Sequence, residues 1–415
     1  MEETDVFCEY DGTIVHIPMG KGIGCTTKYG GGKIMRRVWI ILLVACLLVS
    51  LGLPARAVEL EVAGKSALLM DAATGKVLYE KNAHEPLAPA SVTKVMTMLL
   101  IMEAIDSGRI SWNDSVTASE TAAAKGGSQI YLKAGETMSV SDMVKSIAVS
   151  SANDCACAMA EFLAGTEGAF VAQMNKKAAE LGMEHTHFVN CTGLDDETAA
   201  SSHLTCAYDI ALMSRELLVQ HPDIKKFTTI WMDTVRDGSF GLANTNKMVR
   251  FYPGSTGLKT GFTAKAGYCL SSSARRDGME LIAVVLGADS SANRFAACRT
   301  MLDYGFANFA LVSPEAQQGS VAVKLGVQAT VEAVPGETVQ LLVDKNQRGD
   351  VTVQVQLQDQ VDAPVSQGQK LGTMTVRSGQ QVLAQIPMVA RDGVARLTWG
   401  QIFMKVLRRF VMGGG

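Results

Sequence analysis

A serine and a lysine stand three positions apart at the start of a long apolar segment. Residues 88–105 read APASVTKVMTMLLIMEAI, and Lys94 is the only charged residue before Glu103. The segment predicts a helix from Ser91 to Ile105 that is buried on nearly every side, which would desolvate Lys94 and lower its pKa. A neutral amine on the same helix face as a serine hydroxyl makes a nucleophile with its own base. The helix start also favours a developing alkoxide on Ser91.

A second interpretation of this pair is open, because an isolated S-x-x-K usually means a capping serine and a lysine that extends to water. Two further patterns favour chemistry. Residues 151–153 read S-A-N just before an apolar helix, and residues 259–261 read K-T-G at the start of a predicted strand. The set S-x-x-K, S-x-N and K-T-G, in this order, is typical of β-lactamases and penicillin-binding proteins.

Other stretches resemble one family within that group. Residues 187–217 contain an F-x-N-x-x-G-L core that is followed by a Tyr-Asp helix. Together with GGSQIYLKAGE at 126–136 and LDYGFANF at 302–309, they are similar to the D-alanyl-D-alanine carboxypeptidases of the low-molecular-mass penicillin-binding type. The resemblance extends over the whole chain after residue 57, including its β-rich part and its tail.

This resemblance implies catalytic roles for particular residues. Ser91 would attack the carbonyl of a terminal D-Ala-D-Ala bond and form an acyl-enzyme, while Lys94 would take its proton. Ser151 would pass a proton towards the leaving amine. The backbone N–H groups of Ser91 and Phe262 would form the oxyanion hole, at about 3 kcal/mol per donor.

The resemblance also implies substrate-binding residues. Asn153 would hold the substrate amide, Lys259 would add positive potential, and Thr260 would bind the terminal carboxylate. Gly261 would let the substrate lie along the strand, because a side chain there would block it.

One position departs from the family pattern. In relatives an arginine just after the last core strand can help to bind the substrate carboxylate. This chain has Asp289 at that place, and the nearest arginine is Arg294. The sequence therefore leaves the role of an arginine in carboxylate binding open.

The implied partners are peptidoglycan stem peptides ending in D-Ala-D-Ala, with β-lactam antibiotics as covalent inhibitors and no cofactor. A formal net charge of −3 gives no reason to expect nucleic acid. No metal site is expected, because the only close histidine pair, His185 and His187, is not part of a helical H-E-x-x-H.

Two other functions compete with this one. A serine β-lactamase commonly needs a loop glutamate in an E-x-x-L-N-like setting, which the sequence after Glu167 does not match. A silent wall-binding module could keep the same fold, but the intact S-x-x-K, S-x-N and K-T-G residues argue against it.

Patterning predicts an α+β fold in a chain of 415 residues, and the resemblance implies that it is of the β-lactamase/transpeptidase type. Residues 58–309 mix strands and helices, with hairpins expected at turns 73–75 and 276–278, which favours an antiparallel sheet covered by helices. Residues 315–395 alternate apolar and polar positions between Gly, Pro and Asp, which predicts a small all-β domain that serves as a stalk.

The start of the chain resembles an export signal. Residues 35–57 combine two arginines, an apolar stretch and an Ala-Arg-Ala ending, which predicts a signal peptide cleaved after Ala57. An uncleaved anchor is the alternative. Residues 1–34 precede a natural start at Met35 and are interpreted as a start-site artefact or a disordered leader. We expect the protein on the outer face of the cytoplasmic membrane, facing the cell wall.

The tail, residues 397–415, predicts an amphipathic helix. Its apolar residues fall on one stripe by steps of three and four, and its basic residues lie off that stripe. The stripe consists of Trp399, Ile402, Phe403, Val406, Leu407, Phe410 and Val411, and the basic residues are Lys405, Arg408 and Arg409. The tail is too short to span a bilayer, so we expect it to lie in the membrane interface. A helix docked on the β-domain is the alternative.

The cysteines beyond the signal peptide are scattered singly among apolar residues, which indicates buried free thiols rather than a disulfide framework. They are Cys155, Cys157, Cys191, Cys206, Cys269 and Cys298.

Overall fold

The computed structural model describes residues 9–10, 13–14, 60–195, 202–315 and 317–412. The chain forms two compact units, residues 1–59 and residues 60–415. In the first unit, β1 (Glu9–Tyr10) pairs with β2 (Thr13–Ile14). The rest of the predicted leader and the whole predicted signal peptide lie outside the described residues.

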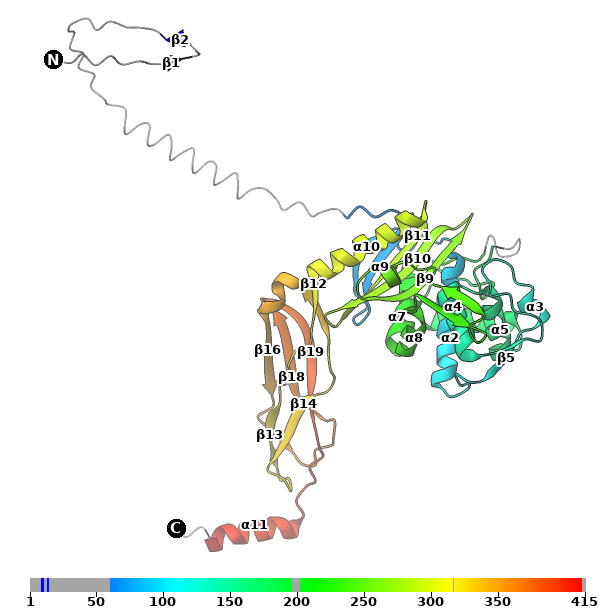
Figure 1. Ribbon diagram of the computed structural model, residues 1–415. Coiled ribbons are helices and arrows are strands. Elements are labelled where there is room, and N and C mark those ends of the chain that lie inside the picture. The colour runs from blue at the N-terminus through cyan, green and yellow to red at the C-terminus, as the bar shows by residue number, and fades with distance from the viewer. Residues whose placement is uncertain (1–8, 11–12, 15–59, 196–201, 316, 413–415) are drawn as a thin grey trace, which may run out of the picture. The chain divides into compact units, whose positions relative to one another are not determined.

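A five-stranded antiparallel sheet forms the centre of the helix-rich part of the second unit (Figure 1). In spatial order its strands are β4 (Val77–Lys81), β3 (Ser66–Asp71), β11 (Met279–Ala288), β10 (Gly267–Arg276) and β9 (Ser255–Thr263). The two hairpins expected from the sequence are confirmed, because β3 pairs with β4 and β10 pairs with β11. The sequence predicted the K-T-G residues at the start of a strand. They lie instead in the middle of β9.

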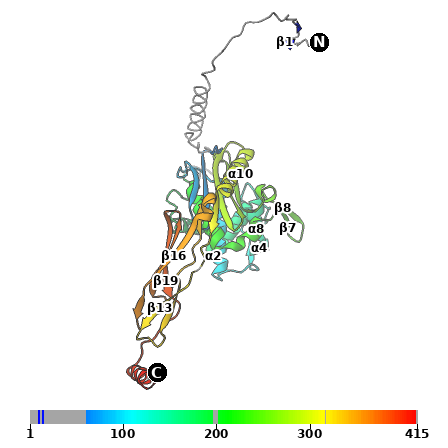
Figure 2. The same ribbon diagram turned by 90° about the vertical axis from the view of Figure 1, so that its left-hand side faces the viewer.

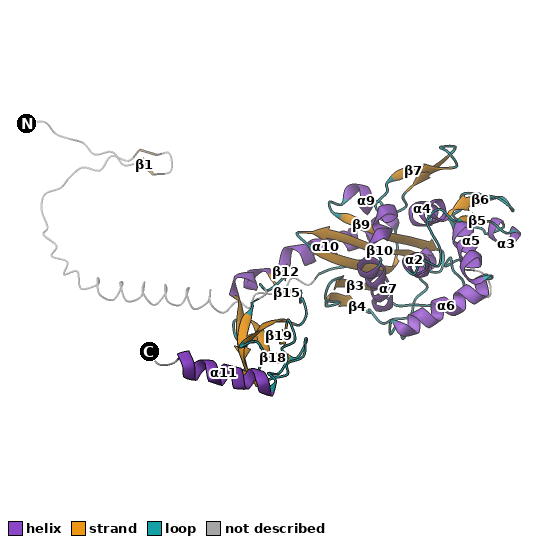
Figure 3. Ribbon diagram, turned by 90° about the horizontal axis from the view of Figure 1, so that it is seen from below, coloured by secondary structure: helices purple, strands orange, loops and turns teal. Residues whose placement is uncertain are grey.

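Helices cover both faces of this sheet, and alternation along β3 shows why. Leu68 and Met70 belong to a core shared with α2 (Lys94–Asp106), α4 (Val140–Ser150), α5 (Asn153–Ala164) and α7 (Ala207–Gln220). Ala67 and Leu69 point the other way, into a core shared with α10 (Ser291–Asn308). Since successive side chains of a strand face opposite sides, a strand buried on both faces has consecutive apolar residues, as Ala67–Met70 do. Figure 3 shows α2 and α7 beside the orange strands.

Shorter elements complete this part of the chain. They are η1 (Ala90–Thr93), β5 (Ser115–Thr117), α3 (Glu120–Ala123), β6 (Thr137–Ser139), α6 (Glu167–Glu180), η2 (Pro222–Ile224), α8 (Lys225–Thr228), β7 (Met232–Val235), β8 (Phe240–Ala243) and α9 (Met248–Phe251). The helix expected from Ser91 to Ile105 therefore begins as the 3-10 turn η1 and becomes α-helical at Lys94.

A six-stranded sheet with its own apolar core follows, drawn in yellow to orange in Figures 1 and 2. Its order is β16 (Val351–Leu357), β18 (Lys370–Ser378), β19 (Gln381–Ala390), β14 (Thr330–Pro335), β13 (Gly319–Lys324) and β17 (Gln360–Asp362). β12 (Phe309–Val312) pairs with β15 (Leu341–Asp344), which leads into η3 (Lys345–Asp350), and α11 (Trp399–Met412) ends the described chain. The predicted fold class, an antiparallel sheet covered by helices followed by an all-β domain and a terminal helix, is confirmed.

The prediction of free thiols is also confirmed. All six cysteines that follow the predicted signal peptide are buried, and none of them forms a disulfide.

Candidate active site

Ser91 and Lys94 meet at the junction of η1 and α2. The apolar sequence of α2 buries it among α4, α5 and α7, and Lys94 is fully buried with it. Its Nζ lies 3.0 Å from Ser91 Oγ and donates a hydrogen bond of 2.8 Å to the carbonyl oxygen of Thr192. Ser91 remains partly exposed. The alternative in which Lys94 extends to water is therefore wrong.

Burial gives Lys94 the protonation behaviour of a base. It lowers the pKa of the Lys94 ammonium to about 7, against the opposing influence of Cys191 and Asp154. Near neutral pH a substantial fraction of this amine is unprotonated, so its lone pair can accept the proton of the adjacent Ser91 hydroxyl.

The F-x-N-x-x-G-L stretch positions the Thr192 carbonyl oxygen, which accepts the hydrogen bond from Lys94. Asn190 Oδ1 accepts hydrogen bonds from the backbone N–H groups of Thr192 (3.1 Å) and Gly193 (2.6 Å), and Asn190 Nδ2 donates to Leu194 O. An asparagine that bonds the backbone two and three residues ahead fixes a tight turn. The turn aims Thr192 O at Lys94, a role that sequence reasoning did not assign to either residue.

Gly193 lets this turn press on the nucleophile segment. Its φ is +78°, and a Cβ built there would lie 1.9 Å from the carbonyl oxygen of Ala90, the residue before Ser91. Ala90 itself has a φ of +49°. Only glycine fits both the backbone conformation and the close approach at position 193.

The S-x-N residues lie at the junction of α4 and α5. Ser151 is buried and ends α4 with a φ of +64°, and Asn153 begins α5. Asn153 donates through Nδ2 to Gly126 O at 2.8 Å, while its Oδ1 is buried without a hydrogen-bond partner among the described residues. Next to it, the Asp154 carboxylate accepts the N–H groups of Ile130 and Leu132, which secures the 126–136 stretch.

The K-T-G strand lies against the nucleophile turn. A Cβ on Gly261 would lie 2.7 Å from Pro89 O and 3.1 Å from the backbone nitrogen of Ser91. Glycine is thus required because β9 packs on the segment that carries Ser91. The expected role of Gly261 in leaving room for the substrate stays a prediction. Thr260 Oγ1 lies 2.7 Å from Thr245 Oγ1, and the Thr245 N–H donates to Val149 O in α4.

Lys259 adds a second buried amine to the site. Its Nζ donates to Thr260 O at 3.0 Å. Burial lowers the pKa of Lys259 well below its usual value, and the positive charges of Lys94 and Arg294 lower it further. The approach of Gly261 to the Ser91 nitrogen places the K-T-G strand beside the S-x-x-K segment.

Arg294 is the arginine that the sequence left open. It is buried in the first turn of α10 and donates through Nη1 to Gly261 O at 2.8 Å and to Cys269 O at 3.3 Å. Its Nε is buried without a hydrogen-bond partner among the described residues. Asp289 instead accepts a hydrogen bond from Asn293 at the start of the helix. The structure therefore places a guanidinium directly behind the K-T-G strand.

The oxyanion hole expected from Ser91 and Phe262 stays a prediction. Phe262 follows Gly261 on β9, and its ring packs on that of Tyr268 with the centroids 4.3 Å apart. The close approach of Gly261 to the Ser91 nitrogen brings the two chain segments that would supply the donors together.

The Glu167 carboxylate is held by hydrogen bonds from two neighbouring residues. Its carboxylate accepts the Lys125 ammonium at 2.6 Å and the N–H and thiol of Cys191 at 3.2 Å. Burial alone would raise the pKa of Glu167, but the hydrogen bonds from Lys125 and Cys191 lower it below its usual value. Glu167 is thus an ionised brace for the turn behind Lys94, which agrees with the absence of a β-lactamase glutamate motif.

Among the described residues there is no cluster able to hold a metal ion and no single helix able to span a membrane. No three His, Cys, Asp or Glu side chains there are grouped so that they could hold a metal ion. No single described helix is long and apolar enough to cross a membrane, and only the pair α5 and α6, bent by 84°, meets those criteria together.

Two family models match the sequence. Residues 54–290 match the model described as D-alanyl-D-alanine carboxypeptidase, and residues 306–396 match the C-terminal domain of penicillin-binding protein 5. D-alanyl-D-alanine carboxypeptidase DacF of Bacillus subtilis is 45% identical over 348 residues, which cover 82% of this chain and 88% of that protein.

Solved structures are similar as well. Penicillin-binding protein 5 from Haemophilus influenzae has a TM-score of 0.70 and 26% identity, covering 81% of this chain and 98% of that chain. Penicillin-binding protein D2 from Listeria monocytogenes, solved in its ampicillin-bound form, has a TM-score of 0.52 and 32% identity, covering 60% of this chain and 99% of that one.

The packing of Gly193 predicts a destabilising substitution. Gly193→Ala should lower the free energy of unfolding by about 3 kcal/mol, because the methyl group overlaps Ala90 O in addition to the cost of a left-handed backbone. Urea unfolding followed by circular dichroism measures the loss. Gly182→Ala is the matched control, with a φ of +70° and open space around its Cβ position. It should cost only about 1 kcal/mol. Equal losses in the two variants would contradict the contact.

Proposed function

The chain belongs to the D-alanyl-D-alanine carboxypeptidase family and is a serine-type carboxypeptidase, and we propose how its residues divide the reaction. The observation that carries the proposal is the 3.0 Å approach of the buried Lys94 amine to Ser91 Oγ. A serine with a poised base three residues away, on a rigid buried helix, is arranged for nucleophilic attack.

Acylation then follows in balanced steps. Lys94 Nζ accepts the Ser91 proton while Ser91 Oγ bonds to the carbonyl carbon of the penultimate D-alanine. The backbone N–H groups of Ser91 and Phe262 stabilise the oxyanion. Ser151 relays a proton to the leaving amine as the C–N bond breaks, which releases the terminal D-alanine. Water then hydrolyses the ester and returns Ser91.

Substrate orientation depends on the polar groups around the nucleophile. Asn153 Oδ1, a buried acceptor with no described partner, would accept the N–H of a substrate amide. The Thr260 hydroxyl would bind the terminal carboxylate, with Lys259 hydrogen-bonded to the Thr260 carbonyl oxygen and positive potential from Arg294 behind the strand. These groups suit a peptide that ends in a free carboxylate, and we propose peptidoglycan stem peptides ending in D-Ala-D-Ala as the substrate.

β-Lactam antibiotics are proposed as covalent inhibitors of the same serine. The Listeria monocytogenes relative was solved in its ampicillin-bound form. A strained amide that reaches Ser91 Oγ would acylate it by the same steps.

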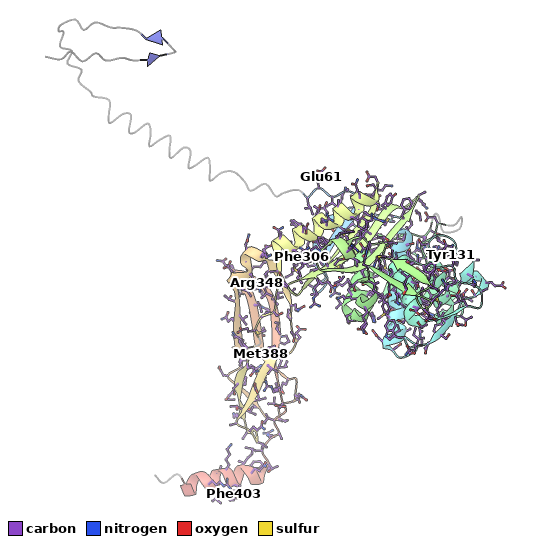
Figure 4. All side chains as sticks on the ribbon, viewed as in Figure 1. Glu61, Tyr131, Phe306, Arg348, Met388 and Phe403 are labelled. Carbon is purple, nitrogen blue, oxygen red and sulfur yellow. The ribbon has the colours of Figure 1, made fainter. Side chains whose placement is uncertain are left out.

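The working place is proposed to be the outer face of the cytoplasmic membrane. The sequence of residues 35–57 supports export, and α11 supports attachment. Trp399, Phe403 and Leu407 are exposed on α11, with Lys405 and Arg408 available for anionic head groups (Figure 4 labels Phe403). The β-domain would act as a stalk between membrane and catalytic domain.

The nucleophile assignment is tested by mass spectrometry. Incubation with benzylpenicillin should add one drug mass to the peptide that carries Ser91. Ser91→Ala should abolish the adduct, and Lys94→Arg should slow its formation by at least about a hundredfold, because arginine stays charged and cannot act as base. A stable adduct on another serine, or an unchanged rate in Lys94→Arg, would contradict the assignment.

The lowered pKa of Lys94 predicts the pH dependence of acylation. Since the neutral amine is the active form, the acylation rate should rise with pH through about 7 and level off above it. From pH 5 to pH 7 the increase should be about fiftyfold, the change in the neutral fraction. Stopped-flow acylation with a fluorescent penicillin measures the profile. A rate that stays constant from pH 5 to 9 would argue against a lysine base.

Membrane attachment is tested by removing the tail. A chain that ends at Arg396 should no longer sediment with phosphatidylglycerol vesicles, because the apolar stripe of α11 is missing, yet it should keep its penicillin acylation rate. Phe403→Glu with Leu407→Glu should have the same effect at full length. If the truncated chain binds vesicles as well as the intact chain, the anchor lies elsewhere, and an uncleaved segment 38–53 becomes the candidate.

A further inference from the structure

The turn between β13 and β14 exposes two large aliphatic side chains. Leu325 is 40% exposed and Val327 is 52% exposed, whereas Val321 and Val323 on the preceding strand are buried in the β-domain core. An aliphatic pair at a turn is unusual, because turns favour polar residues and glycine.

The backbone forces both side chains outwards. Leu325 has a φ of +58°, a left-handed conformation that costs a non-glycine residue about 1 kcal/mol. Gly326, between the two, is packed on the domain, because a Cβ there would lie 2.6 Å from Val323 Cγ1 and 2.9 Å from Val394 Cγ1. The turn is therefore fixed on the β-domain through Gly326, and Leu325 and Val327 cannot fold into the core.

The same turn is bonded to the segment that leads into α11. The Leu397 N–H donates to Leu325 O at 2.8 Å, and the Val327 N–H donates to Ala395 O at 2.9 Å. Trp399 begins α11 two residues after Leu397 and is 88% exposed. Two residues of chain span at most roughly 7 Å, so the exposed turn and the start of the exposed helix lie side by side.

Strand topology puts this apolar pair at one end of the β-domain. β19 leaves the sheet at Ala390, the end at which Ala390 pairs with Ala333 of β14 and the β13–β14 turn lies. The opposite end carries the β18–β19 hairpin, next to the start of β16. Val382 in that hairpin is 42% exposed and serves as a comparison.

Charges around the turn suit an anionic surface. Arg396 is exposed between the turn and α11, and Lys405 and Arg408 are exposed on the helix. Lys324 is also exposed, although Asp362 lies opposite it in the parallel pairing of β13 with β17. Exposed aliphatic side chains beside a helix with aromatic and basic residues are better suited to bind an anionic lipid interface than a protein partner.

We propose that the turn Leu325–Gly326–Val327 is a second membrane contact, which inserts into an anionic bilayer beside α11. The inference rests on the proposed membrane role of the tail and extends it. Hydrogen bonds hold the turn to residues 395–397. The bilayer would therefore contact the β-domain itself as well as α11. The domain would then stand on the membrane in a defined orientation.

Vesicle binding of the full chain tests the proposal. The probe is a vesicle of phosphatidylglycerol and phosphatidylcholine in equal amounts. Leu325→Asn with Val327→Thr removes the apolar surface with little strain, because asparagine tolerates a left-handed backbone and threonine matches valine in shape. The partition coefficient should fall about tenfold. Val382→Thr, at the opposite end of the domain, should bind as the unsubstituted chain does.

Hydrogen–deuterium exchange provides a readout that needs no variant. Added vesicles should slow exchange in residues 324–329 and leave residues 378–383 unchanged. Unchanged exchange at 324–329, or unchanged binding of the turn variant while Phe403→Glu with Leu407→Glu loses binding, would overturn the second contact and leave the tail anchor intact. Retained binding in both variants would instead overturn the membrane role of the tail.

Discussion

The removal of Lys94 from water is the constraint on which the rest of the site depends. An ammonium in an apolar core is costly, so the lysine gives up its proton near neutral pH and becomes a base. It still needs a hydrogen-bond acceptor, which Thr192 supplies at 2.8 Å. The apolar character of α2 is thus part of the chemistry as well as of the packing.

Close contacts between backbones then bring the S-x-x-K segment, the Asn190 turn and the K-T-G strand together. Gly193 allows the Asn190 turn to approach Ala90, and Gly261 allows β9 to approach the Ser91 nitrogen. A side chain at either position would overlap the facing backbone, so the segments would have to move apart. Because catalytic geometry tolerates errors of only about half an ångström, these two glycines have functional consequences without touching a substrate.

The β-domain has a separate apolar core. Its sheet and that of the catalytic domain bury different sets of side chains, so apolar residues exposed at its far turn are not needed for either core. Leu325 and Val327 adjoin the start of α11 through backbone hydrogen bonds. The proposed attachment through this turn and α11 would therefore not depend on the packing of the catalytic site.

Local pattern alone determined a large part of this protein. The spacing of Ser91 and Lys94, the two hairpins, the alternation of the β-domain and the burial of the cysteines all depend on neighbours a few residues apart, which a sequence displays directly. Only the tertiary structure decided that the Thr192 carbonyl oxygen accepts a hydrogen bond from Lys94. It also decided that Gly261 faces Pro89 and Ser91, and that Arg294 lies behind the K-T-G strand. These contacts join residues 33 to 172 positions apart, and their geometry depends on how helices and strands pack, which no local periodicity encodes.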